Sequence, residues 1–89
     1  MRSVVTIIGK DKVGIIAKVS EELAKNNVNI LDINQTVMQE YFTMIMLVDI
    51  SKCSIELVTL KKNLEKIGEE MGLSIKLQRE DIFKKMHEI

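Results

Sequence analysis

The stretch from residue 7 to residue 16 reads I-I-G-K-D-K-V-G-I-I and marks a change from a strand to a helix. Before it, Ser3 to Ile8 is rich in β-branched residues, which favour strands. After it, from Gly14 to Asn26, apolar residues recur at spacings of three and four, which predicts an amphipathic helix. The connection is either a tight turn capped by Asp11 or a loop that holds a small charged molecule, and the stretch alone leaves both interpretations open.

The remaining segments continue the alternation of strands and helices. Residues 28–39 and 41–50 are predicted to be two strands joined closely enough for a hairpin, with a β-bulge expected near Gln35. The second helix is expected to begin at a Ser54 cap and to end before Gly72, because apolar residues repeat at helical spacing between them. A half-buried strand at 73–78 and a short helix at 79–89 follow.

This order predicts an α+β fold: a ferredoxin-like βαββαβ sandwich with an extra short C-terminal helix, in a single domain of residues 1–89. The first and third strands are apolar on both faces, so we place them in the centre of the sheet, with the second and fourth strands at its edges. A helix as short as the last one is not stable alone, so it must dock on the open sheet face or on a partner chain.

The composition limits the kinds of molecule that the chain is expected to bind. Thirteen basic residues balance thirteen acidic ones, which gives no general attraction to nucleic acid or to anionic lipid. No apolar stretch approaches the roughly 20 residues that span a bilayer, so no membrane insertion is expected. Cys53 is the only cysteine, which excludes an intrachain disulfide and indicates a cytoplasmic protein.

Several uses of this architecture require residues that the chain lacks. RNA recognition needs aromatic residues on the central strands, but the first strand has none, and Tyr41 and Phe42 of the third strand point to opposite faces. Cys53 and the single His87 are isolated, so no metal site is expected. No nucleophile stands near a base, so we predict no catalytic residues, no cofactor and no enzyme activity. The class of function that remains for this architecture is a binding module.

Three local features together resemble ACT domains over nearly the whole chain. They are D-K-V-G-I-I at 11–16, N-N-V-N-I-L-D-I at 26–33 and the apolar third strand. The C-terminal Q-R-E-D-I-F-K-K-M-H-E-I at 78–89 is similar to the tail of a small group of stand-alone ACT proteins, which are themselves similar to the ACT repeats of the glycine-cleavage transcriptional regulator. The resemblance implies a sensor of an amino acid or another small molecule, with the ligand at a homodimer interface.

In the family, the ligand touches the first β-α loop of one chain and the second strand of another. Carried over by position, the implied ligand-binding residues are Asp11, Gly14, Ile15, Asn29 and Ile30. Asp11 would bind an amino group, N–H groups near Gly14 and Ile15 a carboxylate, and the Asn29 amide either kind of group.

Two further features bear on association. The second strand carries no proline or lysine to block pairing with a second copy at its edge. The apolar sheet face and the dockable C-terminal helix also fit an alternative function, a protein–protein interaction module without a small-molecule ligand.

Overall fold

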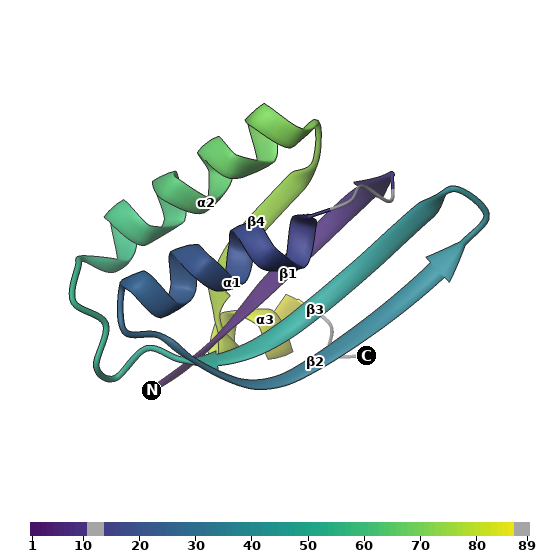
Figure 1. Cartoon of the computed structure of the whole chain (residues 1–89). Helices are drawn as coiled ribbons and strands as arrows, with labels where there is room; N and C mark the ends of the chain where they lie inside the picture. Colours follow the sequence, from purple (N-terminus) through teal and green to yellow (C-terminus); the bar gives the residue numbers. More distant parts are fainter. Residues whose placement is uncertain (11–13, 87–89) are drawn as a thin grey trace.

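The computed structural model describes residues 1–10 and 14–86. Its elements follow the predicted order and confirm the α+β, ferredoxin-like fold with a short C-terminal helix (Figure 1). They are β1 (Arg2–Lys10), α1 (Ile15–Lys25), β2 (Asn29–Met38), β3 (Tyr41–Asp49), α2 (Leu57–Met71), β4 (Ser74–Arg79) and α3 (Glu80–Met86).

The four strands form one antiparallel sheet in the order β2-β3-β1-β4. Strands β1 and β3 are central and β2 and β4 are at the edges, as predicted from their apolar faces. Helices α1 and α2 lie side by side on one face of the sheet, and the β2–β3 hairpin extends away from them (Figure 1). The hairpin turn is the two residues between Met38 and Tyr41, and Gln39 adopts a positive φ of 56° there.

The core lies between the two helices and the sheet face that they cover. Alternate residues of β3 are buried because a strand points successive side chains to opposite faces. Helix α1 buries the residues that its spacing predicted, with the exception of Ile16, which is 46% exposed. The buried apolar residues of this core are Val5, Ile7, Ile15, Val19, Leu23, Val28, Phe42, Met44, Met46, Val48, Leu60, Leu64, Ile75 and Leu77.

Two local predictions were wrong. Helix α2 begins at Leu57 with Glu56 as its N-cap residue, so Ser54 does not cap it. The Ser54 N–H instead donates to the Asn26 carbonyl at 2.9 Å, and this bond holds the β3–α2 connection against the end of α1.

The β-bulge lies between Ile30 and Asp32, and not near Gln35. The extra residue, Leu31, lets Ile30 and Ile33 face the helices although they are three positions apart.

Helix α3 packs against β1 and β4 of its own chain. It covers part of the sheet face opposite to α1 and α2: Val4, whose side chain points to that face, is only 4% exposed and lies outside the main core cluster. The Arg2 guanidinium donates two hydrogen bonds to Glu80 Oε1, at 2.9 and 3.1 Å, which ties the start of α3 to the start of β1. The C-terminal helix therefore docks within the chain, one of the two arrangements expected.

Candidate functional site

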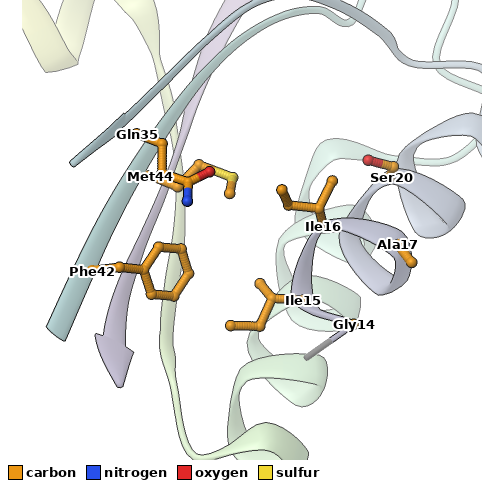
Figure 2. Close-up of a pocket in the computed structure, with 8 residues that line it drawn as sticks. All are labelled: Gly14, Ile15, Ile16, Ala17, Ser20, Gln35, Phe42 and Met44. Atoms are coloured by element: carbon orange, nitrogen blue, oxygen red, sulfur yellow. The ribbon is translucent and has the colours of Figure 1, made fainter. Parts of the chain in front are cut away.

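A groove of about 460 Å³ lies between the start of α1 and the strands β2 and β3 (Figure 2). Phe42 and Met44 reach from β3 toward Ile15 and Ile16 of α1, so the walls of the groove are mainly apolar. Two polar side chains, from α1 and β2, complete a lining made of Gly14, Ile15, Ile16, Ala17, Ser20, Gln35, Phe42 and Met44.

The start of α1 offers hydrogen-bond donors to this groove. Gly14 is the N-cap residue, with a left-handed φ of 88°, and no side chain in residues 1–10 or 14–86 caps the helix with a hydrogen bond. The first turn contains no acidic residue. Because the first N–H groups of a helix have no partner within the helix, they favour a carboxylate or another anion placed before them.

The structure places the predicted ligand-binding residues in two different regions. Gly14 and Ile15 line the groove, whereas Asp11 and the isolated His87 lie outside the described residues. Asn29 and Ile30 are at the start of β2 and do not line the groove of their own chain. Asn29 borders a separate polar hollow at the other end of α1, and Ile30 packs against the core.

Six lining residues were not predicted as site residues: Ile16, Ala17, Ser20, Gln35, Phe42 and Met44. The sequence carried one signal for them, because Gln35 interrupts the apolar side of an otherwise alternating strand. Its register partner across the hairpin is Met44, so the amide stands on the helix side of the sheet and reaches the groove.

The open side of the groove is the edge of β2. Among the described strands, β2 pairs with β3 alone. Its helix-facing residues Ile33 and Val37 are 43% and 54% exposed, and Leu31 at the bulge is 45% exposed. An unprotected edge strand with apolar side chains fits pairing with another strand.

Among the described residues that line the groove, none has an ionisable side chain. Asp49, at the opposite end of β3, has its pKa held below the ordinary value of 3.8, because the Ser51 hydroxyl and N–H donate to its carboxylate at 2.6 and 2.9 Å.

Within residues 1–10 and 14–86 no group of three or more His, Cys, Asp and Glu side chains could hold a metal ion. The same residues contain no helix long and apolar enough to cross a membrane.

A four-stranded antiparallel sheet in the order β2-β3-β1-β4, with two helices on one face, is the ferredoxin-like fold. A family model described as the ACT domain matches residues 2–78, so the chain belongs to the ACT domain family. The resemblance predicted from the sequence is therefore confirmed. No catalytic domain is evident in the 89 residues.

Two proteins of about the same length and one longer protein are similar to the chain. A UPF0237 protein from Methanocaldococcus jannaschii is 58% identical over 88 residues, which cover 99% of this chain and 98% of that one. The solved structure of an ACT domain protein from Streptococcus pneumoniae has a TM-score of 0.79 and 39% identity, with 94% of each chain covered. A putative glycine cleavage system transcriptional repressor shares the fold, with a TM-score of 0.69 and 24% identity over 86% of this chain and 44% of that chain.

Proposed function

We propose that this ACT domain, one of a family of regulatory small-ligand-binding modules, senses an amino acid or a related small molecule at a homodimer interface. One observation carries the proposal: the groove joins the first N–H groups of α1, which no described side chain caps, to an open strand edge. A volume of about 460 Å³ falls within the usual range for small-molecule sites, roughly 300–1,000 Å³. The sole cysteine supports a cytoplasmic location for the sensor.

The groove supplies complementary groups for an α-amino acid. The first N–H groups of α1 would bind its carboxylate, and Phe42 and Met44 would contact an apolar side chain. The Gln35 amide and the Ser20 hydroxyl supply further donors and acceptors. Asp11, by analogy with the family, would bind the amino group.

The dimer explains how Asn29 and Ile30 would join the site. Val37 pairs with Phe42, so the end of β2 that lies beside the groove is its C-terminal end. If two β2 edges pair antiparallel about the middle of the strand, the partner's Asn29 and the partner's Ile30 come beside Met38 and Val37. The site would then be complete only in the dimer.

Ligand binding is tested by thermal-shift and calorimetric titration of the full chain with the twenty amino acids. A ligand at 100 times its Kd stabilises the folded state by about 2.7 kcal/mol, which raises the Tm of a domain of this size by roughly 10–20 °C. An absence of any shift across the panel would contradict the sensor and favour the alternative function.

Two glycine variants provide a matched pair for the same titration. Gly14 and Gly72 both have a positive φ, 88° and 71°, and an added Cβ meets no atom of the described residues within 4 Å at either position. Gly14→Ala and Gly72→Ala should therefore cost similar backbone strain, about 1–2 kcal/mol. Only Gly14→Ala should weaken ligand binding, because Gly72 lies at the end of α2. Equal binding by both variants would contradict a site at the start of α1.

The alternative is a protein–protein interaction module without a small-molecule ligand. The exposed apolar residues along β2, Leu31, Ile33 and Val37, favour it. A pull-down that compares the full chain with a chain lacking α3 distinguishes the two functions. Loss of a partner with no response to any amino acid would support the module.

A further inference from the structure

A second groove, of about 310 Å³, lies beside the C-terminal half of β4, at the edge of the sheet opposite to β2 (Figure 1). We call it the β4 groove. The start of α2 borders it on one face of the sheet, and α3 borders it on the other. Four apolar residues and two cations contribute to its lining: Leu57, Val58, Leu77, Ile82, Lys61 and Arg79.

The β4 groove opens along the edge of the sheet, and not over one face. Leu77 pairs with Val5 of the core, whereas Gln78 pairs with Val4, so the side chains of Leu77 and Gln78 point to opposite faces. Both residues nevertheless line the same groove, which therefore runs around the backbone that joins them. Among the described strands β4 pairs with β1 alone, so its outer edge is open to a further strand.

The apolar lining suits the side chains of an extended peptide. Val58 on one face and Ile82 on the other are 62% and 42% exposed, and Leu77 lies buried between them. Proteins that bind a peptide at a sheet edge hold its backbone by main-chain hydrogen bonds and receive its alternate side chains in pockets. The groove volume lies at the lower end of the range for small-molecule sites, roughly 300–1,000 Å³, so it accommodates a few side chains.

The charge at this edge is positive, which selects the chemistry of the peptide. Lys61 forms no ion pair with any described residue, and Arg79 forms only an exposed one, with Asp81 at 3.5 Å. Lys76 adds an exposed cation to β4, and none of the described residues that line the groove is acidic. Pairing of two β4 edges would set like charges against one another, whereas a segment with acidic residues would complement them.

We propose that the β4 groove binds an extended segment of another protein, with apolar and acidic residues, as a further strand beside β4. Antiparallel pairing places one acidic residue opposite Arg79 and another opposite Lys76. Of the two apolar residues between them, one contacts Leu77 and Val58, and the other contacts Ile82 on the opposite face. The site uses neither the groove at α1 nor the β2 edge, so it does not depend on an amino-acid ligand.

The test is the binding of a labelled peptide with uncharged ends to the full chain, followed by fluorescence anisotropy. The peptide has the order glutamate, valine, valine, glutamate, threonine, threonine, which sets its glutamates opposite Arg79 and Lys76. We expect a Kd between about 1 µM and 1 mM, and binding at least about tenfold weaker when lysine replaces both glutamates. If the first peptide does not bind at about 1 mM, the proposal is overturned and the amino-acid sensor is unaffected.

Methylated forms of the peptide test strand pairing itself. Successive N–H groups of a strand point to opposite sides, so only one of the two valine nitrogens can face β4. Methylation of that nitrogen should abolish binding, and methylation of the other should preserve it. Equal affinities of the two methylated peptides would overturn the proposal, because side chains alone would then account for binding.

Two lysine variants of α2 are a matched pair. Lys61→Glu reverses a charge in the β4 groove, and Lys66→Glu makes the same change at an exposed position outside it. Lys61→Glu should weaken peptide binding about tenfold and Lys66→Glu less than about twofold, with similar Tm values for both. Gly14→Ala, at the proposed amino-acid site, should bind the peptide as the wild type does. Equal effects of the two lysine variants, or loss of binding in Gly14→Ala, would exclude the β4 groove as the site.

Discussion

The close approach of α2 to β4 at Gly68 predicts that alanine, normally the better helix former, destabilises this protein. A Cβ added at Gly68 would lie 2.7 Å from the Leu73 carbonyl oxygen and 3.2 Å from Ile75 Cγ1. The Leu73 backbone cannot move aside easily, because its N–H donates to the Gly68 carbonyl at 2.7 Å in the turn that ends α2. The left-handed Gly72, with φ of 71°, belongs to the same turn.

The expected loss follows from two opposing effects. In a helix interior, alanine is favoured over glycine by about 1 kcal/mol. Overpacking of a close contact costs about 1–3 kcal/mol, and the upper part of that range applies to Gly68 because the clashing oxygen belongs to the backbone. Gly68→Ala should therefore lower the free energy of unfolding by about 1–2 kcal/mol. For a domain of this size, that corresponds to a fall in Tm of roughly 5–15 °C.

The assay is urea and thermal unfolding followed by circular dichroism. Lys66→Gly and Lys66→Ala give the intrinsic difference at an exposed position of the same helix, where alanine should be the more stable variant by about 1 kcal/mol. At position 68, glycine should instead be the more stable of the two residues. A Gly68→Ala protein as stable as the wild type would refute the reasoning, because α2 could then move away from Leu73 without cost.

Three other perturbations have defined outcomes. Ser3 is fully buried and its hydroxyl has no partner among the described residues, so Ser3→Ala should raise the unfolding free energy by about 1 kcal/mol in urea titrations; a loss of stability would contradict this. The pKa of Asp49 is lowered in the folded state, so the carboxylate stabilises the protein above pH 3.8, and this contribution is lost as the pH falls through the lowered pKa. The stability gap between wild type and Asp49→Ala should therefore be present at pH 7 and shrink below pH 4, and a gap that is independent of pH would exclude the effect. Arg2→Ala should change global stability by less than about 1 kcal/mol, because the pair is partly exposed, but hydrogen exchange in α3 should accelerate while α2 stays protected; unchanged exchange in α3 would show that the Arg2–Glu80 bonds do not hold it.

The fold could be predicted because its signals are local and repeated. Alternation in β3 and helical spacing in α1 each involve many residues, so one exception such as Ile16 does not change the prediction. The start of α2 and the bulge could not be located in this way. The Ser54 backbone N–H donates to the Asn26 carbonyl, far away in the sequence, and this long-range bond fixes the connection before α2. The place of the bulge depends on which residues of β3 pair with β2.

The candidate site was only partly predictable for the same reason. Gly14 and Ile15 belong to the strand-to-helix connection, which a sequence pattern marks directly. Ser20, Gln35 and Phe42 meet them only through the packing of α1 on β2 and β3. Family resemblance supplied Asn29 and Ile30, whose place beside the groove requires the proposed dimer and remains a prediction.

The bulge at Leu31 also gives the hairpin a tolerance in length. Leu31 has no residue opposite it, so its deletion would leave Ile30 beside Val48 and Asp32 beside Leu47, and no later side chain of β2 would change sides. Loss of any single residue between Ile33 and Met38 would instead exchange the polar and apolar sides of part of the strand. Relatives that differ by one residue in this segment should therefore differ at Leu31, where a change in chain length leaves both surfaces of the hairpin intact.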